Sequence, residues 1–157
     1  MSIRTSPLGQ IARSLASQTD LWEPLVRYDD QTRYYTRLLG EPGYEVWLLS
    51  WLPGQGTLWH DHGGSAGAFA TVRGTLTERH AVALGDGTAR IAPGERRLSG
   101  GEVRPFGRQH IHQVTNDDLV PAVSIHVYAP SLSEMHEYEP SGTLLSLSRS
   151  QLAGVNW

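Results

Sequence analysis

The stretch Gly54–Gly74 reads GQGTLWHDHGGSAGAFATVRG and guides the interpretation of the rest of the chain. It carries His60 and His62 two positions apart, framed by glycines and by alternating small and apolar residues. Successive side chains of a strand point to opposite faces, so these two imidazoles project from one face and can meet a single metal ion. The stretch predicts a metal site at the mouth of a small β-barrel.

The chain on both sides of this stretch consists mostly of short β-prone runs separated by Gly and Pro turns. The runs are Tyr34–Leu39, Tyr44–Leu52, Gly67–Val72, Thr75–Leu84, Ala89–Ile91, Val103–Pro105, Ile111–Val114 and Pro121–Tyr128. Many short strands of this kind, each closed by turn residues, predict an all-β sandwich or barrel. Asp86-Gly87 is the strongest local hairpin signal. The tail, Leu144–Trp157, is consistent with a last strand and a packed C-terminal end.

Apolar residues recur at three- and four-residue intervals between residues 7 and 28, which predicts short helices before the barrel. Asp20 is a candidate N-cap for the second of these helices. With 157 residues the chain is long enough to bury a hydrophobic core, and no linker or composition shift divides it. We therefore expect one domain over residues 1–157, with a helical segment at 1–30 and a β-barrel at 32–150.

The composition excludes several classes of function. The formal net charge is −3 and the basic residues are scattered, which leaves no electrostatic footprint for nucleic acid. The absence of cysteine excludes disulfides, zinc–thiolate sites and thiol nucleophiles. No window approaches the roughly 18 apolar residues of a membrane span, and the N-terminal residues lack the apolar core of a secretory signal. We expect a cytoplasmic monomer without nucleic-acid or membrane partners.

Seven histidines are present, and their spacing separates metal-ligand candidates from structural residues. A lone histidine on a half-buried strand is more often hydrogen-bonded than metal-bound, which is how we interpret His80 and His136. His110 and His112 repeat the spacing of the first pair on another expected strand. The sequence does not by itself decide which of these two faces inward.

The histidine pair also lies in a longer frame, which consists of Gly54, His60, His62 and Gly74. This frame resembles the first cupin motif, in which a Glu follows the second His by four or five residues. Here Ala66 and Gly67 occupy those positions, so the carboxylate ligand is missing. His112 followed by Asn116 resembles the end of the second motif. The resemblance implies an all-β cupin fold, a double-stranded β-helix or jelly-roll barrel. It also implies a site of three neutral histidines, which are His60, His62 and His112.

Three neutral imidazoles leave a divalent ion with two net positive charges, whereas a carboxylate ligand would leave one. The extra charge favours an anionic co-ligand such as a thiolate, because coordination lowers the usual thiol pKa of about 8.5. Ligands on one side leave positions open for substrate and O₂, as in facial-triad iron enzymes. Three histidines also hold catalytic zinc, so the ligand count does not name the metal.

A set of five clusters narrows the choice of enzyme. The clusters are Tyr35-Thr36-Arg37, Trp51, His60-Asp61-His62, His112 with Val114 and Asn116, and Ser124-Ile125-His126-Val127-Tyr128 followed by Ala129-Pro130. Together they resemble cysteine dioxygenase from about Tyr35 to Pro130. The resemblance implies a non-haem Fe(II) on the three histidines, L-cysteine and O₂ as substrates, and cysteine sulfinic acid as product.

The same resemblance assigns a carboxylate-binding role to Arg37, with Tyr35 and Trp51 beside the substrate. A guanidinium suits this role because it donates two parallel hydrogen bonds to a carboxylate. Ser124, His126 and Tyr128 lie at i, i+2 and i+4 and share one strand face. They form a candidate catalytic relay, although the same spacing would also place three polar residues on an outer face.

One position departs from the animal members of this family, and one peptide bond matches the family. In the animal members a cysteine joins the tyrosine by a thioether; Gly67 stands there in this chain, which excludes the bond and is expected to leave room beside Tyr128. The Ala129-Pro130 bond matches a cis peptide of the family, and we expect it to be cis.

Three alternatives remain open at this point. A 3-mercaptopropionate dioxygenase is expected to carry Gln in place of Arg37, so the arginine favours cysteine. A zinc or nickel hydrolase or isomerase would need a carboxylate base, and Asp61 points away from its histidine neighbours. A metal- or sugar-binding cupin without catalysis would not explain why Arg37 and the relay occur together.

Overall fold

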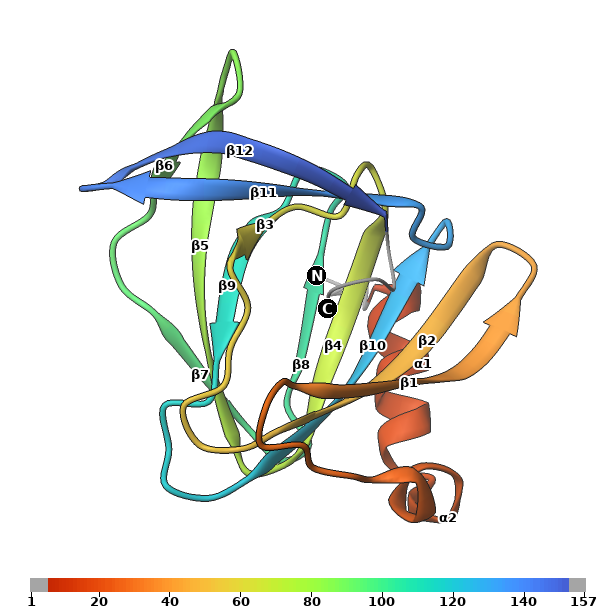
Figure 1. Ribbon diagram of the computed structural model, residues 1–157. Coiled ribbons are helices and arrows are strands. Elements are labelled where there is room, and N and C mark those ends of the chain that lie inside the picture. The colour runs from red at the N-terminus through yellow and green to blue at the C-terminus, as the bar shows by residue number, and fades with distance from the viewer. Residues whose placement is uncertain (1–5, 153–157) are drawn as a thin grey trace, which may run out of the picture.

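The computed structural model describes residues 6–152, and Figure 1 shows them as a β-barrel with short helices at one side. The helices are α1 (Pro7–Ala16), α2 (Thr19–Trp22) and the 3₁₀ turn η1 (Glu23–Leu25). The first six strands are β1 (Tyr34–Glu41), β2 (Tyr44–Trp51), β3 (Trp59–His60), β4 (Ala66–Arg73), β5 (Thr75–Gly85) and β6 (Thr88–Ile91). The remaining strands are β7 (Arg96–Ser99), β8 (Val103–Phe106), β9 (Ile111–Thr115), β10 (Ala122–Ala129), β11 (Glu134–Ser141) and β12 (Leu144–Leu152).

The strands form two antiparallel sheets that face each other. One sheet has the order β1-β2-β10-β4-β8, and the other has the order β6-β12-β11-β3-β9-β5-β7. Because β6 also pairs with β5, six strands of the second sheet close into a ring. This architecture confirms the predicted all-β jelly-roll barrel with short N-terminal helices.

Strand β10 is buried on both faces, and its two faces carry different chemistry. Val123, Ile125 and Val127 belong to the hydrophobic cluster that includes Ala12 of α1, on the outer side of the sheet. Helix α1 covers this side (Figure 1), and its N-terminus is capped by the Ser6 hydroxyl. The alternate residues of β10 must therefore point between the sheets, where the second cluster lies.

Several local predictions can be compared with these elements. Asp86-Gly87 does form the β5–β6 hairpin, with positive φ angles of 54° and 73° as such a turn requires. Asp20 is not an N-cap: α2 begins at Thr19, and Asp20 lies in its first turn. Strands β7 and β11 were not expected, because their sequences are rich in charged residues. Leu144–Leu152 forms β12, while residues 153–157 of the predicted C-terminal end lie outside the described residues.

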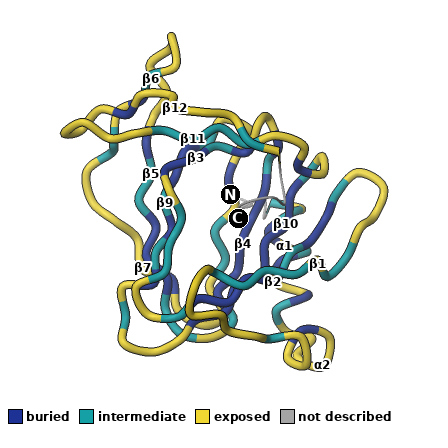
Figure 2. Tube along the Cα trace, viewed as in Figure 1, coloured by how far each residue is buried: buried dark blue, intermediate teal, exposed yellow. Residues whose placement is uncertain are grey.

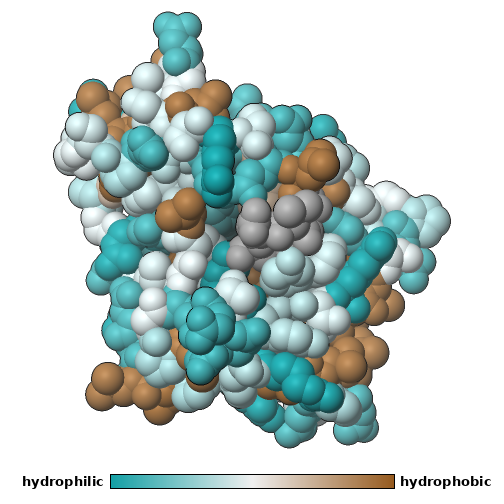
Figure 3. All heavy atoms as spheres, viewed as in Figure 1, coloured by the Kyte–Doolittle hydropathy of each residue, from teal (hydrophilic) through white to brown (hydrophobic). Residues whose placement is uncertain are grey.

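The buried residues lie mainly on the strands of the barrel. Figure 2 shows buried residues along the central strands and exposed residues at the hairpin ends and connecting loops. On the face drawn in Figure 3, hydrophobic residues lie in small groups among hydrophilic ones. Within residues 6–152, no helix has the length and apolar character that crossing a membrane requires.

Candidate metal centre and its cavity

Three histidines meet inside the barrel, two from neighbouring strands and one from the segment that follows β3, although the sequence predicted His60 and His62 on one strand. His60 of β3 lies directly opposite His112 of β9 in the sheet register, and His62 follows two residues after His60. All three side chains are buried, and their ring centroids lie 4.7 to 5.0 Å apart. One nitrogen from each ring lies within 4.8 Å of the others, which makes the three a metal-site candidate.

Two of these rings are oriented by their second nitrogen. Nδ1 of His60 lies 2.8 Å from the carbonyl oxygen of Leu58, and Nδ1 of His112 lies 2.8 Å from Oε2 of Glu78. Both partners accept a hydrogen bond, so each Nδ1 carries the hydrogen and each Nε2 is left with its lone pair. Metal-binding histidines are commonly held in this way.

His62 gives the clearest indication of a missing ligand. Neither of its ring nitrogens has a hydrogen-bond partner among the described residues, although both are buried. An unsatisfied buried polar atom costs about 1–3 kcal/mol, and such atoms in native proteins call for an explanation. Burial, followed by the neighbouring histidines, lowers the pKa of His62 well below its usual value and keeps the ring neutral. A neutral imidazole with a free lone pair at this place fits a metal ligand.

The structure also separates His110 from His112, a choice that the sequence left open. Both side chains approach Glu78, but only His112 belongs to the cluster with the first pair. His110 stacks on Phe106 at 5.0 Å, and its Nε2 lies 3.1 Å from Glu78. His110 is therefore a neighbour of the centre, whereas His112 is part of it.

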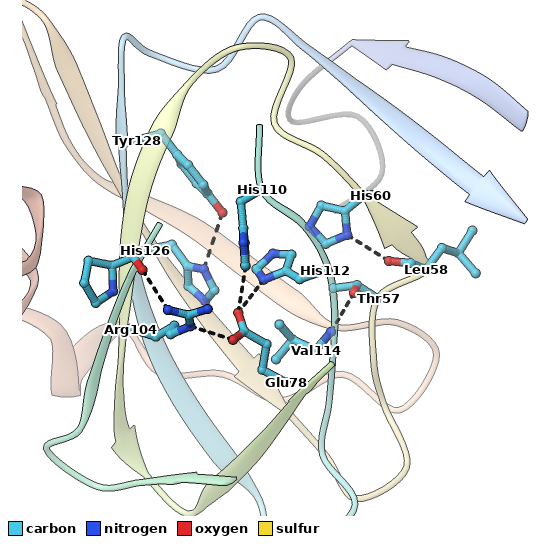
Figure 4. Close-up of polar contacts among 11 residues, drawn as sticks. Thr57, Leu58, His60, Glu78, Arg104, His110, His112, Val114, His126 and Tyr128 are labelled. Carbon is cyan, nitrogen blue, oxygen red and sulfur yellow. Dashed lines mark hydrogen bonds and ion pairs between the residues drawn. The ribbon is translucent and has the colours of Figure 1, made fainter. Parts of the chain in front are cut away.

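Glu78 of β5 is the residue that sequence reasoning missed. Its side chain is 2% exposed, and Figure 4 shows it between His110, His112 and Arg104. Burial alone would raise the pKa of Glu78, but hydrogen bonds from the two histidines and from Arg104 hold it well below the usual range. The available signal was alternation: Leu76 and Glu78 share one face of the strand, so an acid falls on the core side of an apolar run.

The expected relay faces the interior rather than the solvent. Ser124 Oγ lies 2.7 Å from Nε2 of His126 and accepts a hydrogen bond from Nε1 of Trp51 at 2.8 Å. Nδ1 of His126 lies 3.4 Å from the Tyr128 hydroxyl, as the dashed line in Figure 4 indicates. Burial lowers the pKa of His126 to about 3 and raises that of Tyr128, so both groups are neutral. The four side chains thus form one chain of polar contacts that ends at the phenol.

A cavity of about 290 Å³ adjoins the histidines and the relay. Its lining includes His60, His112, His126, Tyr128, Trp51, Leu49, Val114, Met135, Arg33, Glu137 and Arg149. Glu137 and Arg149 lie opposite each other on β11 and β12 and form an ion pair at 2.9 Å. The rest of the wall combines apolar side chains with polar ones.

Arg33 places a half-buried cation at the wall of this cavity. Its guanidinium lies 5.2 Å from the Trp51 ring centroid, and its Nε donates to the carbonyl oxygen of Gly56 at 3.0 Å. Nη1 is buried and has no partner within residues 6–152. Burial lowers the pKa of Arg33 to about 10, so the group remains charged at neutral pH. A cation with a buried, unused donor is suited to an anionic group of a ligand.

Arg37 lies elsewhere, which corrects its expected position. It is not among the cavity-lining residues; its side chain is 53% exposed and lies 3.9 Å from Glu45. The register of β1 shifts between Arg37 and Leu39, and the guanidinium turns back toward the Leu39 carbonyl. Tyr35 also stays outside the lining and packs edge-on against Trp47, whereas Trp51 is in the cavity wall as expected.

The room that was expected beside Tyr128 at Gly67 is not present. A Cβ there would lie 2.5 Å from Cζ of Phe106 and 2.6 Å from the Val127 carbonyl oxygen. The Phe106 ring stacks on His62 at 4.6 Å, so it fills the position that was expected to be open beside Tyr128. The Ala129-Pro130 bond is cis, as expected.

Asp61 points away from the centre, as expected. Its carboxylate accepts hydrogen bonds from Nδ1 of His136 at 2.8 Å and from the Tyr138 hydroxyl at 2.7 Å, both on β11. The backbone N–H of Asp61 bonds to the His136 carbonyl as well. Asp61 therefore fastens the turn between the two histidines to β11, and His136 has the structural role expected of it.

The barrel and its three inward imidazoles define a cupin-type protein with a three-histidine metal-site candidate. Similar solved structures include a protein from Thermus thermophilus, with 23% identity and a TM-score of 0.58 over 69% of this chain and 93% of that one. A double-stranded β-helix protein from Klebsiella pneumoniae has 16% identity and a TM-score of 0.57, over 81% of this chain and 93% of that one. A cupin sugar phosphate isomerase from Silicibacter pomeroyi has 18% identity and a TM-score of 0.56, over 80% of each chain. At these identities the likeness concerns the fold.

The family is shown by a match to the sequence model for cysteine dioxygenase type I, which covers residues 3–141. The chain belongs to the cysteine dioxygenase type I family, as its motifs indicated, and this makes it a dioxygenase-type enzyme. A search of curated proteins finds no match to this chain.

Proposed function

We propose that the protein is a thiol dioxygenase that converts L-cysteine and O₂ to cysteine sulfinic acid. The proposed ligands of its Fe(II) are His60, His62 and His112. The observation that carries the proposal is the buried trio of neutral imidazoles, with both nitrogens of His62 unpartnered among the described residues. Membership of the cysteine dioxygenase type I family supports the reaction class.

The reaction adds both atoms of O₂ to the sulfur, and the thiol needs no other reductant. A ferrous ion on the three histidines would bind the thiolate and bring O₂ to it, which is chemistry that protein side chains do not supply. The protein itself orients the substrate in the cavity and places one phenol beside the sulfur.

Arg33 is the proposed anchor for the substrate carboxylate. The sequence pointed to Arg37 for this role, but Arg37 lies outside the cavity, while Nη1 of Arg33 is buried at its wall. The Trp51 ring stacks against the guanidinium and restricts its direction. The carboxylate would thus be held at one end of the cavity with the sulfur toward the histidines.

Tyr128 is the proposed catalytic residue beside the sulfur. The Ser124 hydroxyl accepts from Trp51 and donates to Nε2 of His126, which places the His126 hydrogen on Nδ1. Nδ1–H then faces the Tyr128 oxygen and directs the phenol hydrogen toward the cavity. A neutral phenol in this position can donate a hydrogen bond to the charge that develops on sulfur and oxygen.

Oxygen consumption by the iron-loaded protein with L-cysteine tests the proposal, with the product identified by mass. We expect one O₂ consumed per cysteine and a mass increase of two oxygen atoms. Disulfide as the only product, or no oxygen uptake by protein that retains its iron, would refute the function.

A second candidate, 3-mercaptopropionate dioxygenase, is favoured by one observation. The preference for cysteine depended on Arg37, and Arg37 is not in the cavity lining. Arg33 would bind the carboxylate of either thiol equally well. The two are separated by comparing kcat/KM for the two thiols, and a higher value for 3-mercaptopropionate would replace the cysteine assignment.

A further inference from the structure

His112 differs from the other histidines of the centre in what holds it. Its Nδ1 lies 2.8 Å from a carboxylate oxygen of Glu78, whereas Nδ1 of His60 bonds to a backbone carbonyl. The other oxygen of Glu78 accepts from Nε of Arg104 at 2.7 Å (Figure 4). A buried carboxylate is costly to keep even when it is paired, so its place beside this ring needs a reason.

The chemistry of the contact supplies that reason. An imidazole that donates Nδ1–H to a carboxylate is fixed in one tautomer and one ring orientation, and its Nε2 becomes a more basic ligand. Three neutral imidazoles bring no charge to a divalent cation. Glu78 brings a negative charge one hydrogen bond away, and it also lies between the Arg104 cation and His112.

We infer that Glu78 is a positioning residue of the metal centre. Its carboxylate holds His112 with Nε2 toward the bound metal and supplies the negative charge that the three imidazoles lack. The inference rests on the metal centre of the proposed function, and it is independent of which thiol is oxidised.

Glu78, His110 and His112 also bring ligand atoms within 4.8 Å of one another, which raises the question of a second metal site. The contacts argue against it. Nε2 of His110 and Nδ1 of His112 already lie 3.1 and 2.8 Å from Oε2 of Glu78. Nε of Arg104 lies 2.7 Å from Oε1. A second cation would replace these hydrogen bonds and repel the guanidinium, so the cluster supports the first site.

The test measures the affinity of metal-free protein for Co²⁺ without any thiol. Glu78→Gln keeps the side-chain shape and removes the charge, and we expect it to weaken Co²⁺ binding about 10- to 100-fold. Glu95→Gln is the matched control, because Glu95 also pairs with an arginine, Arg79 at 2.5 Å, but lies 46% exposed on the outside. We expect no change in the control. Circular dichroism establishes that each variant is folded.

A second measurement reads the His112 tautomer directly. In ¹⁵N NMR of the metal-free wild type, we expect Nδ1 of His112 to be protonated and Nε2 to be unprotonated. In Glu78→Gln we expect this preference to weaken, which a purely structural role of Glu78 would not produce.

Two results would overturn the inference: a folded Glu78→Gln that binds Co²⁺ as tightly as the wild type, or a wild-type His112 protonated on Nε2. The second result decides the matter even if the variant does not fold. Tight Co²⁺ binding without cysteine oxidation by the iron-loaded protein would instead refute the proposed function and leave this inference intact.

Discussion

Replacing Arg33 by Met should separate substrate binding from every other function of the cavity. Met retains much of the side-chain length that packs on the Trp51 ring, and it removes the charge. In the wild type, Nη1 of Arg33 is buried without a partner among residues 6–152, so it is available to a carboxylate. The substrate carboxylate would lose this contact in Arg33→Met.

The magnitude follows from the burial of the pair. Removing one partner from a buried, hydrogen-bonded charge pair costs about 2–4 kcal/mol, toward the lower part of the known range because Nε of Arg33 already bonds to Gly56. At about 1.36 kcal/mol per factor of ten, kcat/KM for cysteine should fall roughly 30- to 900-fold. Most of this loss should appear as a higher KM, since the carboxylate is bound before and during the reaction.

The assay compares cysteine with cysteamine, which has the same thiol and amine but no carboxylate. We expect Arg33→Met to lower kcat/KM for cysteine and to leave the value for cysteamine nearly unchanged. Arg37→Met is the control, and its kinetics should match the wild type because Arg37 lies outside the cavity. The reverse outcome, a loss in Arg37→Met and none in Arg33→Met, would show that the carboxylate is bound where the sequence motif suggested.

Three further changes test the centre and its surroundings. Tyr128→Phe should retain its metal and lower kcat about 10- to 150-fold, the loss of one hydrogen bond to a charged group; loss of metal would contradict a role beside the sulfur. His112→Ala should bind no iron by elemental analysis, while His110→Ala should remain loaded, and the opposite pattern would exchange the ligand. Gly67→Ala should lower the free energy of unfolding in urea by about 1–3 kcal/mol, because its Cβ meets a ring and a carbonyl. Gly107→Ala is its control, since a Cβ there has nothing within 4 Å; equal stabilities would refute the packing argument.

The strands and the histidine pair could be predicted from the sequence because their signals are local. Side-chain alternation placed His60 and His62 on one face, and the turn at Asp86-Gly87 was readable in two residues. Strand β11 was missed, because none of its residues is fully buried and its sequence is largely polar. Charged residues on a solvated strand leave no periodic apolar signal.

For the site residues too, the sequence predicted what is local and left the rest to packing. Alternation placed Ser124, His126 and Tyr128 on one face of a strand, but the sequence could not choose between the inner and the outer face. The packing of α1 decided this, because the helix covers Val123 and its apolar companions on the outside. The polar row was left to face the cavity.

The sequence by itself therefore determined the barrel, the family motifs and the pair of imidazoles two residues apart, because each depends on neighbours along the chain. Tertiary structure alone decided which arginine reaches the cavity, since Arg37 lies exposed beside Glu45 while Arg33 lies against Trp51 in the cavity wall. It also decided that Glu78 holds His112, a contact between residues 34 positions apart. The contacts of long side chains with residues distant in sequence depend on how the two sheets pack together, and local sequence patterns do not predict them.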